Sequence, residues 1–293
     1  MNIDKLLKGY RVEQGKHFRL KDCDPSDTHG LKSELKPLAK QLLADGVQEM
    51  SRLQDVLAAQ DRWGLLLIFQ GLDAAGKDGT IKHVMSGVNP EGVDVWSFKA
   101  PTLEELSHDF LWRTTCCLPG RGQIGIFNRS YYEELLVVRV HPELLQNEKL
   151  PKELVTKHIW LERFEDINAF ERYLTRNGIA IVKFFLHVSK AEQKRRFMER
   201  LDNPEKNWKF SADDVKERES WDAYQHAYED MIRNTAAKYA PWYVVPADNK
   251  WFTRLLVAQA IVDTLKSLKL KYPKVSGAEK AELDEARKQL ENE

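Results

Sequence analysis

A glycine-rich segment directly after an apolar run constrains the fold of this chain more than any other feature. Residues 65–69 read LLLIF, a continuous apolar run typical of a parallel strand buried on both faces. Residues 71–77 read GLDAAGK and match the pattern GxxxxGK, and a helical pattern begins at once. A strand, a glycine-rich loop and a helix in this order predict an α/β fold with a phosphate-binding loop.

The chemistry of such a loop assigns roles to its residues. Glycines let the backbone approach phosphate oxygens, N–H groups converge on the anion, and the lysine reaches the transferred group. Lys77 is therefore the predicted catalytic lysine. The predicted phosphate-binding residues are Gly71, Ala74, Ala75, Gly76, Asp78, Gly79 and Thr80. The alternative is an incidental strand-turn-helix connection with a surface lysine, which the agreement of spacing, strand and helix disfavours.

One position departs from the common form of this loop. Asp78 follows the lysine, where a Walker A motif has a serine or threonine that binds magnesium. Asp73, inside the loop, would repel phosphate unless a cation lay between them. We therefore expect Asp73 to be the Mg²⁺ ligand.

A second strand, at residues 124–127, ends in another polar group. Asn128 occupies the position of a Walker B aspartate and carries no charge, so magnesium would depend more on Asp73, on substrate phosphates or on Glu133. Arg129 at the same strand end suits bidentate contact with phosphate oxygens and is predicted to be catalytic. A salt bridge that only stabilises the loop is the alternative for Arg129.

Basic residues concentrate between residues 190 and 218, among them Arg195 and Arg196. A basic helix that ends in a polar segment resembles the lid of nucleotide kinases, which closes over phosphates and excludes water. We expect two or three of these cations to contact substrate. A solvated helix face is the alternative.

Strand and helix patterns alternate along the chain, which predicts a parallel sheet with helices on both faces. Further strands are expected at 93–98, 123–127, 179–188 and 242–246. Helices are expected within 31–60 and at 79–87, 102–117, 131–138, 152–177, 190–201, 221–239 and 251–268. We expect an irregular arm over 1–30, one kinase domain over 31–272 with its lid at about 190–220, and a charged helix over 273–293.

Charge and apolar patterning exclude two classes of protein. Lys plus Arg and Asp plus Glu both total 45, so the basic excess of a general nucleic-acid binder is missing. No apolar run approaches the ~18 residues of a membrane helix, and the first residues lack the apolar core of a signal peptide. We therefore expect a cytoplasmic protein that binds neither nucleic acid nor membrane.

Five segments together carry a resemblance to a known family. They read GLDAAGKDGTIKHVMSGVNPEG, SHDFLWR, IFNRSYYEELLVVRVHPELL, KFFLHVSKAEQKRRFMERL and APWYVVPADNKWFTRLL. From about residue 30 to residue 272 the chain resembles the polyphosphate kinase 2 family, and most of all its class III branch. The resemblance implies a thymidylate kinase-like P-loop fold, Mg²⁺, inorganic polyphosphate as donor, and both nucleoside monophosphates and diphosphates as acceptors.

The resemblance also implies residue roles. It places Asp73, Lys77 and Arg129 in the catalytic set, and Arg195 and Arg196 in the lid. Lys82 and Arg113 fall where the family makes further phosphate contacts. Class III members similarly have asparagine at Asn128, and Glu133 matches an acidic position linked to their broader acceptor range. Asn128 and Glu133 are the predicted acceptor-nucleotide residues, although the assignment of Glu133 to the metal or to the acceptor site stays open.

We therefore expect a kinase that transfers a phosphoryl group reversibly between polyphosphate and AMP or ADP, with ATP as a further nucleotide partner. We also expect a homo-oligomer, a dimer or a tetramer. Two rival functions are an ATP-dependent nucleoside monophosphate kinase of the same fold and a catalytically weak nucleotide-binding regulator, the second prompted by Asn128 and Asp78.

Overall fold

A six-stranded sheet forms the centre of the protein in a computed structural model that describes residues 3–31 and 33–293. The spatial order of the strands is β1-β6-β5-β2-β4-β3. Their bounds are β1 Arg11–Val12, β2 Gly64–Gln70, β3 Val93–Ser97, β4 Ile124–Asn128, β5 Ile179–His187 and β6 Trp242–Pro246. All neighbouring pairs are parallel except β1 with β6. The predicted α/β fold with a largely parallel sheet is confirmed, and β1 adds an antiparallel edge from the expected irregular arm.

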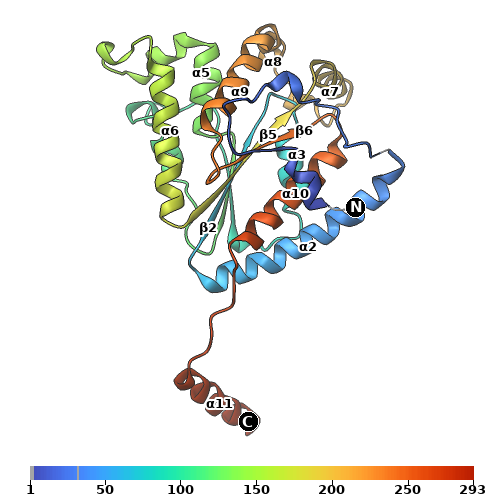
Figure 1. Ribbon diagram of the computed structural model, residues 1–293, viewed down its shortest axis with the longest axis vertical. Helices are drawn as coiled ribbons and strands as arrows, with labels where there is room; N and C mark the ends of the chain where they lie inside the picture. The colour runs from blue at the N-terminus through green and yellow to red at the C-terminus, as the bar shows by residue number, and fades with distance from the viewer. Residues whose placement is uncertain (1–2, 32) are drawn as a thin grey trace.

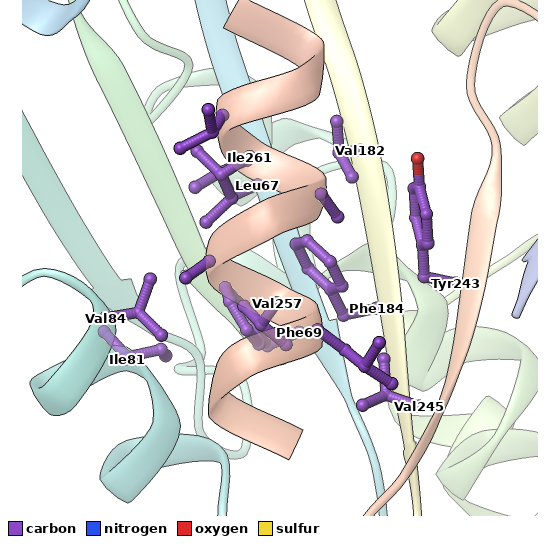
Figure 2. Close-up of a cluster of buried hydrophobic side chains, with 14 of the residues drawn as sticks. Leu67, Phe69, Ile81, Val84, Val182, Phe184, Tyr243, Val245, Val257 and Ile261 are labelled. Carbon is purple, nitrogen blue, oxygen red and sulfur yellow. The ribbon is translucent and has the colours of Figure 1, made fainter. Parts of the chain in front are cut away.

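Three helices cover one face of the sheet: α2 (Lys36–Gln60), α3 (Lys77–Val84) and α10 (Lys250–Ser267) (Figure 1). Val257 and Ile261 of α10 lie over the apolar side chains of β2 and β5, including Phe69 and Phe184 (Figure 2). Phe69 stacks on Phe184 with ring centroids 4.9 Å apart. Burial of this apolar surface is the main force that holds the helices to the sheet.

The other face packs against α6 (Ile159–Arg176) and α9 (Trp221–Thr235). A fully buried ion pair lies there: Lys183 Nζ of β5 donates to Glu171 Oε2 of α6 at 2.6 Å and to the Thr235 carbonyl at 2.9 Å. Tyr131 and Tyr132, from the 3₁₀ helix η5 (Tyr131–Leu135) after β4, donate to the same carboxylate. Because buried charges need such partners, the network fixes the chain that leaves β4.

The remaining elements lie around these two layers. The first residues form α1 (Ile3–Lys8) before β1, and α4 (Trp112–Thr115) and α5 (Val137–Val140) are short. The predicted lid region comprises α7 (Lys190–Asp202), a 3₁₀ turn at Asn207–Lys209 and α8 (Ala212–Glu217). An extended segment leads to α11 (Gly277–Glu291), which lies apart from the rest of the protein (Figure 1).

The structure corrects three helix predictions. Residues 102–117 form only a 3₁₀ turn at Glu105–Ser107 and α4, because Asp109 accepts a bond from the Leu111 N–H and starts a turn where a helix would continue. The helix predicted at 152–177 begins at Ile159, and residues 131–138 are mostly 3₁₀. The other predicted strands and helices are present within a few residues of their expected bounds. None of the described helices is both long and apolar enough to span a membrane.

Candidate active site

The glycine-rich loop lies between the carboxyl end of β2 and the start of α3. A Cβ atom at Gly71 would lie 2.9 Å from the Leu186 carbonyl oxygen, so only glycine lets the loop leave β2 this close to β5. Ala74 has a φ of 62° and Gly76 a φ of 106°, in the left-handed region. This backbone is the turn that the GxxxxGK pattern predicts.

Lys77 begins α3 and turns back over the loop. Its Nζ donates to the Gly71 carbonyl at 2.6 Å and to the Leu72 carbonyl at 3.4 Å, and the residue is only 8% exposed. Burial, followed by the nearby Arg129 charge, lowers the pKa of Lys77 to about 8. The ammonium group is thus held inside the loop, where an incoming phosphate would meet it.

Arg129 lies at the carboxyl end of β4, directly beside the loop, because Phe69 of β2 is in register with Asn128 of β4. Its guanidinium group donates to Asp73 Oδ1 at 2.6 Å and to Glu133 Oε2 at 3.0 Å. The Glu133 charge is the largest cause that raises the pKa of Arg129. Burial opposes ionisation of Asp73, but Lys77 and Arg129 outweigh it and hold the Asp73 pKa below its usual value.

Asn128 and Asp78 form a direct contact across the loop. Asn128 Nδ2 donates to Asp78 Oδ1 at 2.7 Å. The two departures from the common nucleotide-kinase pattern are therefore partners: the uncharged amide at the strand end accommodates a carboxylate at the start of α3. Two acids at these positions would repel one another.

The neighbouring arginines of α7 have different environments. Arg196 is buried, and its guanidinium group donates to the carbonyls of Ala74 at 2.9 Å, Ala75 at 2.8 Å and Ala247 at 2.5 Å, and to Glu192 at 2.7 Å. Arg195 is exposed and pairs with Glu192 and Glu199. The structure places Arg196 as a support of the loop and Arg195 outside the cavity that the loop lines.

A cavity of about 750 Å³, the P-loop cavity, opens over the loop. Its walls include Asp73 to Thr80, Asn128, Arg129 and Arg196. It also holds Arg200 and Lys206 of the predicted basic lid region, and two cations that were not predicted to belong to the site, Lys250 and Arg254. Lys250 and Arg254 lie one turn apart at the start of α10, just after β6. Ligands bind beyond the carboxyl ends of parallel strands, so the position of these two cations after β6 could have predicted them.

A second cavity of about 370 Å³, the apolar cavity, adjoins the first. Arg113, Arg129 and Glu133 line it, together with Phe98 and Phe110. Arg113 donates to the Lys99 carbonyl at 2.8 Å and lies over the Phe98 ring at 5.5 Å. Arg129 lines both cavities, together with Phe98, Lys99 and Ala100, so its guanidinium group lies where the two cavities meet.

Some predicted site residues lie elsewhere. Lys82 is exposed on α3 and lines neither cavity. Asn128, expected at the acceptor, lines the P-loop cavity with Asp78 instead of the apolar cavity. Gly71 lies beneath the loop, in a small third cavity with Asp73. The structure brings together the remaining predicted residues, apart from Arg195, around the two cavities.

Within residues 3–31 and 33–293, no group of three or more histidine, cysteine, aspartate or glutamate side chains is arranged to hold a metal ion. Four carboxylates line the P-loop cavity: Asp73, Asp78, Glu199 and Asp214. Asp73 belongs to the loop itself and is partly exposed, with one oxygen bonded to Arg129. Magnesium is usually bound by one or two carboxylates and completes its shell with water and phosphate oxygens. This donor set fits a magnesium ion that arrives with a phosphate ligand.

Comparison with known proteins decides the family. The sequence model of the polyphosphate kinase 2 family matches residues 35–273. The chain belongs to the polyphosphate kinase 2 family. The predicted family is therefore confirmed, as is its class of enzyme, the phosphotransferases.

Similar proteins agree with this polyphosphate kinase 2 assignment. The chain is 54% identical over 251 residues to an ADP-polyphosphate phosphotransferase of Rhodopseudomonas palustris, covering 85% of this chain and 87% of that protein. It is 46% identical over 267 residues to an AMP/ADP-polyphosphate phosphotransferase of Meiothermus ruber, covering 91% and 96%. The crystal structure of polyphosphate kinase 2 from Arthrobacter aurescens TC1 superposes with a TM-score of 0.85 at 41% identity, covering 95% and 96%. This likeness confirms the P-loop kinase fold.

Proposed function

We propose that this polyphosphate kinase 2 transfers a phosphoryl group from inorganic polyphosphate to AMP and ADP, and that the reaction is reversible. The observation that carries the proposal is the position of Arg129 between a wide basic cavity and a smaller apolar one. The basic cavity suits a polyanion, and the apolar cavity suits a nucleoside. The names of the Rhodopseudomonas and Meiothermus relatives support the same two substrate classes.

The residues of the loop would act by neutralising charge. Phosphoryl transfer needs in-line positioning and electrostatic stabilisation more than covalent chemistry. Lys77 and Arg129 reach the transferred group from the two sides of the cavity boundary, and the N–H groups of Ala74 to Lys77 surround its oxygens. The acceptor oxygen belongs to a phosphate that is already ionised, so no general base is required. The predicted catalytic set of Asp73, Lys77 and Arg129 thus has a chemical role for each member.

We propose Mg²⁺ as the metal and Asp73 as its protein ligand. A bound Mg²⁺ would neutralise phosphate charge and fix the geometry of the donor phosphates. Asp73 stays ionised because Lys77 and Arg129 lie beside it. Asp73 would hold the metal ion through the oxygen that is not bonded to Arg129, and Arg129 would contact the transferred phosphoryl group.

A matrix of donors and acceptors tests the function. The wild-type protein is incubated with Mg²⁺ and either polyphosphate or ATP as sole donor, and with AMP, ADP or no acceptor. We expect ADP from AMP and ATP from ADP with polyphosphate alone. Turnover only with ATP would establish the rival nucleoside monophosphate kinase, and nucleotide binding without turnover would establish the regulatory rival.

We also propose that the chain forms a homo-oligomer through the free edge of β3. Val95 is 53% exposed and Trp96 is 43% exposed on this edge strand, although both are large apolar residues. Unprotected apolar edges pair readily with another chain. Trp96→Lys should lower the mass measured by light scattering after size-exclusion chromatography, whereas an unchanged mass would remove β3 from the interface.

A further inference from the structure

Two glutamates in the apolar cavity have no role in the transfer described above. Glu134 and Glu148 both line this cavity, and Glu134 is only 7% exposed. Glu134 Oε1 makes no hydrogen bond, although it is buried. A buried carboxyl oxygen without such a partner is costly, so its retention at a cavity wall points to a ligand that supplies the missing donor.

Arg163 contacts both Glu134 and Glu148. It is buried on α6, its Nη2 donates to Glu148 Oε2 at 2.8 Å, and its Nε lies 3.5 Å from Glu134 Oε1. Burial and the nearby Glu148 raise the pKa of Glu134 to about 8. The proton that the pair retains at neutral pH is taken up by the hydrogen bond between Glu134 and Glu148, so Glu134 Oε1 stays available as an acceptor.

The rest of the apolar cavity suits a flat heterocycle. Phe98, Leu106, Phe110 and Val137 give it apolar walls. The guanidinium groups near it are engaged: Arg113 bonds to the Lys99 carbonyl, Arg163 to Glu148, and Arg129 to Asp73 and Glu133. The cavity thus presents carboxyl acceptors at the Glu134–Glu148 wall, and the side chains of Lys99, His108 and Asn147 also line it.

We propose that Glu134 and Glu148 read the nucleobase of the acceptor by accepting hydrogen bonds from an exocyclic amino group at purine position 6 or pyrimidine position 4. The proposal rests on the proposed function only in that the apolar cavity holds the acceptor nucleoside. A base with a carbonyl oxygen at that position would place acceptor against acceptor. Adenine and cytosine are favoured, and hypoxanthine and uracil are disfavoured.

Substrate analogues test the proposal on the wild-type enzyme without any mutation. With polyphosphate as donor, kcat/KM is measured for AMP, IMP, purine riboside 5′-monophosphate, CMP and UMP. We expect AMP to exceed both IMP and the riboside monophosphate, and CMP to exceed UMP, by about 10- to 100-fold. Equal kcat/KM for AMP and IMP would overturn the proposal.

Two variants test whether Glu134 and Glu148 cause the preference for AMP over IMP. In Glu134→Gln and in Glu148→Gln, the new amide can donate to a carbonyl oxygen, so the AMP-to-IMP preference should fall by about 10-fold while KM for polyphosphate stays within about twofold. Glu153→Gln, on the exposed turn before α6, is the matched control and should keep the wild-type preference. A variant that lowers AMP and IMP turnover equally would contradict base recognition, and thermal melting shows whether the variant is folded.

Binding separates this inference from the proposed function. Isothermal titration of the wild-type protein with AMP and with IMP needs no turnover. If the donor matrix shows no phosphoryl transfer but AMP binds about 10-fold tighter than IMP, the proposed function fails and base recognition stands. Transfer to AMP with equal affinity for the two nucleotides gives the opposite result.

Discussion

The two cavities that meet at Arg129 differ in what they recognise. The P-loop cavity has about 750 Å³ and takes cations from the loop, from the lid region and from α10. The apolar cavity has about 370 Å³, aromatic walls, the buried Glu134 and the half-buried Glu148. A repeating polyanion needs charge at many equivalent places, whereas a nucleoside needs one shape and one hydrogen-bonding edge. The enzyme therefore separates binding by charge from binding by shape within one active site.

The largest expected effect comes from removing the lysine of the glycine-rich loop. Lys77→Ala should lower kcat by about 10²- to 10³-fold with either AMP or ADP, because it removes charge stabilisation of the transferred group. The measurement is steady-state turnover with polyphosphate as donor. Nucleotide affinity, measured by titration, should be nearly unchanged because Lys77 does not line the apolar cavity. Activity within a few-fold of wild type would remove Lys77 from the mechanism.

Arg196→Lys should distinguish the hydrogen bonds that Arg196 makes to the loop from the positive charge that it carries. A lysine keeps the positive charge but cannot bond to the carbonyls of Ala74, Ala75 and Ala247 together, so we expect a loss of about 1–3 kcal/mol in the free energy of unfolding. Urea denaturation measures this loss. KM for polyphosphate should rise and KM for AMP should not. A variant with wild-type stability would show that the loop holds its shape without this arginine.

The pH dependence of the two substrates should differ. Because the pKa of Lys77 is lowered to about 8 in the free enzyme, the ammonium form is present below that pH and is lost above it. We expect kcat/KM for polyphosphate to fall about tenfold per pH unit above pH 8. Bound phosphate restores the charge, so kcat at saturating donor should hold to higher pH. A kcat/KM profile that is flat to pH 9.5 would contradict the assignment.

The smallest effects are expected at Lys250 and Arg254, the cations that α10 adds to the P-loop cavity. The double variant Lys250→Ala, Arg254→Ala should raise KM for polyphosphate about two- to tenfold and make this KM depend less on salt concentration. Binding releases fewer counterions when two phosphate contacts are lost. KM for AMP should stay within about twofold of the wild-type value. Arg195→Ala is the matched comparison and should change KM for polyphosphate less than twofold. If KM for polyphosphate depends on salt concentration equally in the double variant and in the wild type, polyphosphate does not bind at Lys250 and Arg254.

The sequence predicted those parts of the site that depend on local order. A strand, a glycine-rich loop and a helix determine one another, so the spacing placed Asp73 and Lys77 in the loop. The end of a second predicted strand placed Arg129 beside it, and the catalytic roles of the three residues stay predictions. Arg195 and Arg196 could not be distinguished, because adjacent helical residues differ only in direction and packing decides which one faces the loop. The apolar cavity was missed because residues 102–117 were predicted to be a helix, whereas their turns supply Leu106 and Phe110 to its wall.

The contact of Lys77 with the Gly71 and Leu72 carbonyls has a consequence for which anions the enzyme admits. Two of the three N–H groups of the ammonium group already donate to carbonyl oxygens, so a ligand that takes more than one of them must displace a preformed partner. Singly charged ions such as chloride or acetate offer too little attraction for this exchange, while a chain of linked phosphates offers several charges at once. The carbonyl contacts of Lys77 thus favour the binding of polyanions over the binding of small, singly charged ions.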